Sequence, residues 1–184
     1  MRIAISGKSG CGNTTVSTLL AEKTGFPMVN FTFRQMAQER GVDFWTFCAM
    51  AEQDDNIDRE LDRRMVEMAM ETEDSILGSR LAIWNMKDAD LKVYLTASDS
   101  ERARRIHGRE GGGLDEQLEK TRKRDARDTA RYRRIYGIDN NDTSVADLVI
   151  DTEGKSPEEI VDIIDYFESH VIFSNERSEE HTSE

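Results

Sequence analysis

Residues 7–15 read Gly-Lys-Ser-Gly-Cys-Gly-Asn-Thr-Thr, and this stretch decides how the chain folds. The short apolar run Ile3-Ala4-Ile5 precedes it, and a segment with Val16, Leu19 and Leu20 on one helical face follows it. A strand, a glycine-rich turn and a helix in this order form the context that a phosphate-binding loop (P-loop) requires. Glycines allow several backbone N–H groups to point inward, and the helix N-terminus adds partial positive charge. The stretch therefore predicts an anion site at the start of the chain.

The loop is irregular at one position. The usual pattern ends in Gly-Lys followed by Ser or Thr, and this chain carries Asn13 in place of the lysine. A neutral amide does not supply the charge that reaches the β- and γ-phosphates, and the basic residue of the loop is instead Lys8. Two hypotheses follow. Either Lys8 replaces the missing charge in an enzyme, or the loop belongs to a nucleotide-binding module that does not transfer phosphate.

Composition sets limits on the class of protein. A chain of 184 residues is long enough for one domain with a core, and its net charge of -12 argues against non-specific binding to nucleic acid or anionic membrane. No apolar run is long enough to span a bilayer, and Met1-Arg2 leads directly into a strand, so we expect no signal peptide. Cys11 and Cys48 lack metal-ligand spacing. We expect a cytoplasmic protein whose partners are small molecules.

Apolar runs alternate with helical patterns along the chain. Strands are expected at 1–6, 27–31, 74–78, 91–96 and 148–150. Helices are expected at 14–23, 33–40, 43–53, 56–71, 100–110, 114–135 and 157–167. This alternation predicts an α/β fold in which helices cover both faces of a parallel sheet, with ligands at the carboxyl ends of the strands. We expect a single domain over 1–174 and a disordered acidic tail over 175–184.

Arginines are the second signal in the sequence. Seven of them lie beside strand ends or in the helical pair around Gly111-Gly112-Gly113: Arg34, Arg80, Arg105, Arg109, Arg124, Arg127 and Arg131. The planar guanidinium binds phosphate oxygens in pairs and stays charged, so this set suits phosphorylated ligands. Other basic residues are expected on solvated helix faces: Arg102, Arg104, Arg122, Lys123 and Arg133.

One helical face in the 114–135 segment carries both acid and base. Arg124, Arg127, Asp128 and Arg131 follow each other at helical spacing. The face could consist of ordinary surface salt bridges. It could equally present Asp128 as an acceptor for an exocyclic amine while the arginines bind phosphate.

Several stretches together carry a resemblance to a known family. They are 33–37 (FRQMA) with 39–41 (ERG), 56–64 (NIDRELDRR), 79–84 (SRLAIW), 105–106 with 109–111, 131–139 (RYRRIYGID) and 147–152 (DLVIDT). On these stretches the chain resembles the cytidylate kinases, in particular the short form typical of archaea and some bacteria. Relatives of this form carry threonine at the position of Asn13. This chain also has Gly78-Ser79-Arg80, where the family has an acidic residue just before a glycine and an arginine.

The resemblance implies a three-layer α/β/α P-loop NTPase fold with a five-stranded parallel sheet. It also implies a helical insertion that binds the nucleoside monophosphate at about 31–72 and a helical lid at about 105–131. The implied reaction is ATP-dependent phosphorylation of CMP and dCMP by a monomer with Mg²⁺. A kinase for another monophosphate is the alternative, although Arg34, Arg80 and the Asp128–Arg131 pair suit a phosphorylated pyrimidine.

Site residues carry over position by position. Donor phosphates would lie on the loop, with Thr14 touching Mg²⁺: Gly7, Lys8, Ser9, Gly10, Cys11, Gly12, Asn13, Thr14 and Thr15, joined by Arg105 from the lid. The acceptor nucleotide would be bound by Arg34, Arg80, Asp62, Arg63, Asp128 and Arg131. The catalytic groups would be Lys8, Arg109, Arg124 and Arg131, with lid closure excluding water.

Overall fold

The computed structural model describes residues 1–172, with side chains described for 1–170. Its five strands are β1 (Arg2–Gly7), β2 (Met28–Val29), β3 (Ser75–Gly78), β4 (Leu91–Thr96) and β5 (Leu148–Asp151). They form one parallel sheet in the order β2-β3-β1-β4-β5, which confirms the predicted α/β class and the number of strands. The expected tail at 175–184 lies outside the described residues.

The helices follow the expected pattern closely. They are α1 (Asn13–Thr24), α2 (Phe33–Glu39), α3 (Phe44–Gln53), α4 (Asp55–Met70), α5 (Ala82–Asn85), α6 (Asp99–Glu110), α7 (Leu114–Tyr136) and α8 (Pro157–Phe167), and a π-helical segment, Glu168–Ile172, follows α8. The four-residue helix α5 was not predicted, because a single turn has no room for a helical repeat. The predicted strand at 27–31 is limited to Met28–Val29, because Phe31 leaves the sheet and packs under the guanidinium of Arg64 at 4.1 Å.

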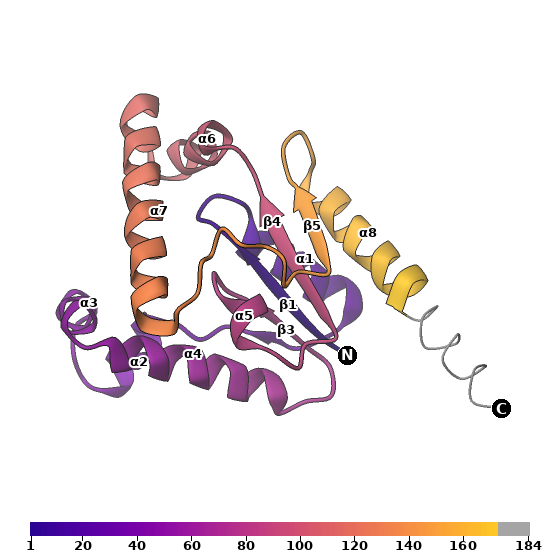
Figure 1. The fold of residues 1–184 in the computed structure, drawn as a ribbon, viewed down its shortest axis with the longest axis horizontal. Helices are drawn as coiled ribbons and strands as arrows, with labels where there is room; N and C mark the ends of the chain where they lie inside the picture. The colour runs from indigo at the N-terminus through magenta and orange to yellow at the C-terminus, as the bar shows by residue number, and fades with distance from the viewer. Residues whose placement is uncertain (173–184) are drawn as a thin grey trace.

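Three layers result from the alternation of side chains along the central strand (Figure 1). Ile3 and Ile5 of β1 point to one face and pack with Leu20 of α1 and Ile164 of α8. Ala4 points to the other face, where α5 and the helices α2–α4 supply the second core. Both faces of the sheet are therefore covered, as its continuously apolar strands require.

Two helical units project from this sheet at the carboxyl ends of its strands. The first contains α2, α3 and α4 and lies between β2 and β3 in sequence. Its helices stay separate because Thr32, Asp43 and Asp54 each cap a new helix by accepting a backbone N–H. The second unit is the α6–α7 hairpin, which turns at Gly111 and Gly112, both with φ near +80° in the left-handed region. No helix within residues 1–172 has the length and apolar character needed to cross a bilayer.

Candidate active site

The 7–15 loop joins the end of β1 to the start of α1, as the sequence predicts. Gly10 (φ +87°) and Gly12 (φ +100°) supply the left-handed turns that curl the backbone. The Cys11 N–H donates to the Lys8 carbonyl at 3.1 Å, which closes the loop. Cys11 is 2% exposed, and burial raises the pKa of its thiol, so this side chain fills the back of the loop as a neutral group.

Asn13 folds back onto the loop instead of reaching out from it. Its Nδ2 donates to the Gly7 carbonyl at 2.7 Å, while its Oδ1 is buried without a partner among the described residues. A Cβ placed on Gly7 would lie 2.6 Å from that Oδ1 and 2.5 Å from the Leu95 carbonyl oxygen, so only glycine fits at position 7. Asn13 therefore stabilises the loop through a hydrogen bond and adds no charge to it.

Positive charge reaches the loop from the two helices opposite it. Arg124 of α7 donates to Ser9 Oγ at 3.3 Å. Arg102 and Arg105 of α6 donate to the backbone carbonyls of Ser9 and Gly10, at 3.1 and 3.3 Å. Three guanidinium groups from outside the loop thus contact it, while position 13 carries no charge.

Arg105 is held from several sides at the end of β5. It donates to Thr152 Oγ1 and to the Thr152 carbonyl, both at 2.9 Å, and to Glu101 at 2.8 Å. Arg105 was predicted at the start of a lid. Its contacts attach this part of α6 to the end of β5, so we expect lid movement beyond Arg105.

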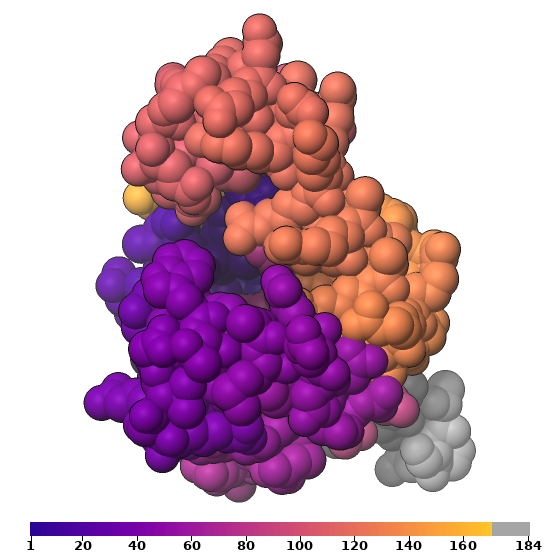
Figure 2. All heavy atoms as spheres, turned by 90° about the vertical axis from the view of Figure 1, so that its left-hand side faces the viewer, coloured from indigo at the N-terminus to yellow at the C-terminus, as the bar shows by residue number. Residues whose placement is uncertain are grey.

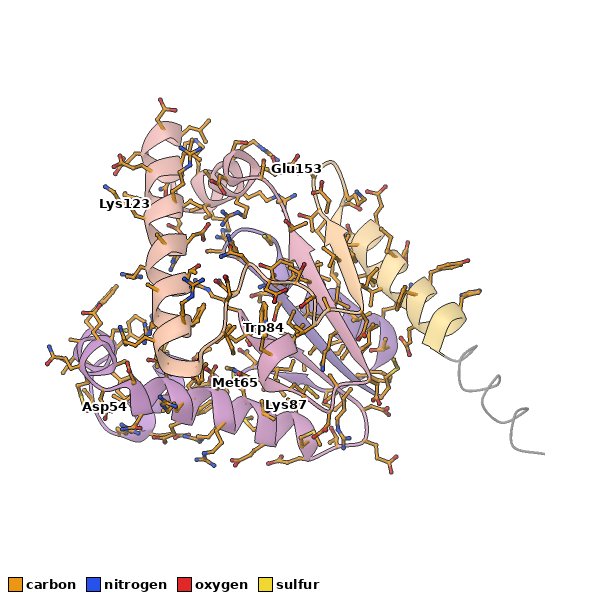
Figure 3. The ribbon with its side chains drawn as sticks, in the orientation of Figure 1. Asp54, Met65, Trp84, Lys87, Lys123 and Glu153 are labelled. Atoms are coloured by element: carbon orange, nitrogen blue, oxygen red, sulfur yellow. The ribbon has the colours of Figure 1, made fainter. Side chains whose placement is uncertain are left out.

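Arg102 contradicts its prediction as a solvated surface residue. Its side chain is 1% exposed and is bound by Asp99 and Asp125 as well as by the Ser9 carbonyl. The reason is its place on α6: Arg102, Ala103 and Ile106 form the buried face of that helix. The remaining residues of that prediction are exposed, as expected: Arg104, Arg122, Lys123 and Arg133. Figure 3 shows Lys123 on the side of α7 that faces away from the sheet.

A cavity of about 620 Å³ lies between α4 and α7, and one of its lining residues, Arg124, also contacts Ser9 of the loop. Figure 2 looks into this hollow, with the purple α2–α4 unit below, the salmon α6–α7 hairpin above and indigo atoms of the N-terminal part at its bottom. The predicted face of α7 lines it in full: Arg124, Arg127, Asp128 and Arg131. Phe33, Leu61, Met65 and Leu81 add apolar walls. Charged groups next to apolar walls suit a ligand with both a phosphate and a flat ring.

Arg80 and Asp128 meet inside this cavity. Arg80 follows β3, Asp128 lies on α7, and the two side chains form a hydrogen-bonded ion pair. Their side chains are 34% and 11% exposed, so the pair is partly open to the cavity. The structure therefore joins the residue proposed for phosphate to the residue proposed for the base.

Carboxylates on α4 hold the C-terminal half of α7. Asp58 pairs with Arg131, and the Tyr136 hydroxyl donates to Asp62. Burial raises the pKa of Asp62 to about 6, against the hydrogen bond from Tyr136, and burial likewise raises the pKa of Asp58. Both acids line the cavity. This cluster fixes the angle between α4 and α7, which sets the width of the cavity.

Four basic residues of the predicted site have side chains that neither line the cavity nor bond to another predicted site residue in the described part of the chain. Arg34 lies over the Phe44 ring at 4.4 Å, and Arg63 pairs with Glu67 on an exposed face of α4. Arg109 is exposed near the tip of the hairpin. Lys8 is partly exposed, and its side chain has no hydrogen bond or ion pair within the described part of the chain. None of the four lines the cavity, so their proposed roles depend on movement or on a bound ligand.

Sequence reasoning missed Asp125, Asp58 and Tyr136 as parts of the site. Asp58 and Asp62 stand four residues apart on α4, and this spacing places them on one face. The sequence therefore contained the signal that these two acids share a face. It did not show which basic or hydroxyl group each acid contacts, because the partners lie more than 70 residues away.

A magnesium site made only of protein groups is absent from the described residues, where no three His, Cys, Asp or Glu side chains converge. Thr14 is exposed in the first turn of α1, so its hydroxyl is free to act as a ligand. Mg²⁺ in phosphoryl-transfer sites keeps several waters and binds mainly through substrate phosphates. The residues present fit an ion that arrives with a nucleotide.

Comparisons with known proteins complete the description. Residues 2–154 match the model of the Cytidylate kinase-like family. The chain is 44% identical over 168 residues to cytidylate kinase 2 of Borreliella afzelii, covering 89% of this chain and 94% of that protein. It is 44% identical over 164 residues to the cytidylate kinase of Pyrococcus abyssi, covering 88% and 90%. Its fold is similar to that of shikimate kinase from Bacteroides thetaiotaomicron, with a TM-score of 0.59, 17% identity and coverage of 92% and 96%.

Proposed function

This chain belongs to the cytidylate kinase-like family, and from that premise we propose that it transfers the γ-phosphoryl group of ATP to CMP and dCMP. The products are ADP and the cytidine diphosphates. The observation that carries this proposal is the pairing of Arg80 with Asp128 in a cavity that Arg124 connects to Ser9 of the P-loop. A cation that suits phosphate and a carboxylate that suits an amine donor thus line one cavity.

Three parts of the molecule have separate roles in this reaction. The single domain contains the sheet with α1, α5 and α8, the α2–α4 unit serves as the insertion that binds the monophosphate, and the α6–α7 hairpin serves as the lid. The lid is anchored at Arg102 and Arg105, so its mobile part is the tip between those anchors and Thr121.

On the donor side, backbone N–H groups of residues 7–15 bind the ATP phosphates at the start of α1. Arg124, already in contact with Ser9, is the group nearest to the transferring phosphate. The Thr14 hydroxyl would hold a Mg²⁺ ion that arrives with the nucleotide, and that ion would neutralise phosphate charge. Lys8 adds charge from the solvent side of the loop.

On the acceptor side, the CMP phosphate binds Arg80 and the arginines of the α7 face. Binding of a dianionic phosphate releases part of the Arg80 charge from Asp128. The freed carboxylate then accepts a hydrogen bond from the exocyclic amine of cytosine, whereas the O4 oxygen of uracil repels it. Phosphoryl transfer needs no covalent intermediate, so positioning and charge neutralisation supply the catalysis.

The test is a substrate panel. Purified protein with ATP and Mg²⁺ is supplied with CMP, dCMP, UMP, AMP or GMP, and ADP formation is followed. We expect turnover with CMP and dCMP well above that with the other three. Asp128→Ala should reduce the preference for CMP over UMP by about tenfold or more while ATP binding stays within about threefold of wild type. Absence of ADP with every cytidine substrate would disprove the proposal.

A further inference from the structure

Arg102 is a buried arginine for which the proposed reaction has no direct use. Its side chain is 1% exposed, and its guanidinium joins three separate parts of the chain. It donates to the Ser9 carbonyl at 3.1 Å, to Asp99 of its own helix at 2.7 Å and to both carboxylate oxygens of Asp125 on α7. The P-loop, α6 and α7 thus meet at one side chain.

Backbone packing fixes this meeting point. A Cβ added to Gly10 would lie 2.9 Å from the Arg102 Cβ and 3.0 Å from the Arg102 carbonyl oxygen. The loop therefore rests directly on α6 at this residue, and Gly10 (φ +87°) is required both for the turn and for the close approach. A shift of Arg102 would move the loop with it.

Stability alone does not account for a buried cation here. Replacement of a buried ion pair by well-packed apolar residues is often neutral or stabilising. Arg102 also leaves its Nε buried without a partner among the described residues, which is itself unfavourable. The arrangement is better explained by what it positions.

Ser9 is contacted from α7 in two ways. Arg124 donates to the Ser9 hydroxyl, and its sequence neighbour Asp125 holds Arg102, which binds the Ser9 carbonyl. We propose that Arg102 is a positioning residue for phosphoryl transfer, which fixes the P-loop at Ser9 against α7 and so holds Arg124 at the transferring phosphate. This inference rests on the proposed function.

The bond to the Ser9 carbonyl has a second consequence. Hydrogen bonds polarise one another, so a peptide whose C=O accepts from a guanidinium has an N–H that donates more strongly. The N–H of that peptide belongs to Gly10, inside the loop. Arg102 thereby strengthens the partial positive charge that the Gly10 N–H presents to phosphate. The effect matters in this loop because Asn13 stands where a P-loop usually has lysine.

The test uses Arg102→Lys and Asp125→Asn, with Arg104→Ala as the matched control on an exposed face of α6. Lysine keeps the charge but is not a planar fork, so it does not bridge Ser9 and Asp125. We expect kcat to fall about 100-fold, since misplacement by about 1 Å costs that much. ATP affinity, measured by calorimetry, should fall about tenfold. The KM for CMP should stay within about threefold, because the CMP contacts lie elsewhere.

Asp125→Asn should give the same pattern. In the double variant, kcat and ATP affinity should fall no further than in the more impaired single variant, because both residues act through one contact. Wild-type kcat and ATP affinity in Arg102→Lys would overturn the inference. A lower Tm with an equal rise in both KM values would also overturn it, since that pattern marks a structural role. Should Arg102→Lys fail to fold, Asp125→Asn decides by the same criteria. Should wild type itself fail to phosphorylate CMP, the proposed function fails, and the ATP affinities still decide the role of Arg102.

Discussion

Arg80 and Asp128 are 48 residues apart in sequence and form an ion pair at the wall of the cavity. Arg80 comes from the end of a central strand and Asp128 from the long helix α7, so the pair joins the rigid sheet to the hairpin above it. In the proposed function, Asp128 neutralises the Arg80 charge until the acceptor phosphate replaces it.

Removal of Arg80 should therefore affect the acceptor and not the donor. We expect Arg80→Ala to lower kcat/KM for CMP by about 100-fold or more, because the acceptor phosphate loses a charge-assisted hydrogen-bond partner, at a cost of roughly 2–5 kcal/mol. ATP affinity should change by less than about threefold. Steady-state kinetics with CMP and ATP varied separately check this. Arg133→Ala, on an exposed face of α7, is the control and should match wild type. A similar loss with both substrates would show that Arg80 does not act on the acceptor.

Lys8 is the cation within the loop itself, and its side chain makes no hydrogen bond or ion pair among the described residues. We expect Lys8→Ala to lower kcat about 10- to 100-fold, since Lys8 is one of several cations near the phosphates. Lys23→Ala is the control, because Lys23 lies in the last turn of α1, at the opposite end of that helix from the loop, and pairs with Asp162 and Asp165 of α8. An unchanged kcat in Lys8→Ala would assign the whole charge at the loop to Arg102, Arg105 and Arg124.

Asp62 should make folding stability depend on pH. Burial raises its pKa from the ordinary 3.8 to about 6, so the folded protein binds a proton more tightly than the unfolded chain does. The contribution of Asp62 to stability is therefore fully present below pH 3.8 and is lost as the pH rises through about 6. The difference corresponds to roughly 3 kcal/mol.

Asp62→Asn removes this titration and keeps an oxygen that can accept from Tyr136. Compared with wild type, the variant should gain free energy of unfolding as the pH rises from 3.8 to about 6 and keep that gain at higher pH, measured by urea unfolding at several pH values. The exposed Asp162→Asn should show no such gain. Parallel pH curves for wild type and Asp62→Asn would contradict the assignment.

Gly78 ends β3, and its surroundings explain the glycine. A Cβ at this position would lie 2.3 Å from Ser17 Oγ and 3.0 Å from Ser17 Cβ, inside the packing of α1 against the sheet. We expect Gly78→Ala to lower the free energy of unfolding by about 1–3 kcal/mol. Gly108→Ala, in α6 with nothing within 4 Å of an added Cβ, should raise it by about 0.5–1 kcal/mol. Denaturant midpoints compare the two, and equal midpoints would contradict this explanation of Gly78.

Much of the fold could be predicted because its signals are local. The apolar run, glycines and helical pattern around residues 7–15 specify strand, turn and helix within about twenty residues, and parallel order follows from the alternation. The α7 face was predictable for the same reason, since spacing alone brings Arg124, Arg127, Asp128 and Arg131 to one side. All four line the cavity.

Pairing across the chain was not predictable. Arg102 is charged, as surface residues usually are, and its burial depends on the approach of the loop backbone at Gly10 as well as on its place on α6. Its spacing from Ala103 and Ile106 placed it on the apolar face of α6, but charge is usually the stronger guide to exposure. Arg131 was assigned to the nucleotide, and the structure pairs it with Asp58. Such partners depend on how α4 and α7 cross, and no local pattern carries that information.

We propose that the 7–15 loop holds ATP for phosphoryl transfer to a cytidine nucleotide, even with Asn13 in place of lysine. ATP labelled at the γ-phosphate tests this when it is supplied with CMP and Mg²⁺ and the labelled products are separated. We expect the label in CDP, with little in inorganic phosphate, because the anchored hairpin excludes water from the transfer site. Label found only in inorganic phosphate, or remaining in ATP, would contradict it.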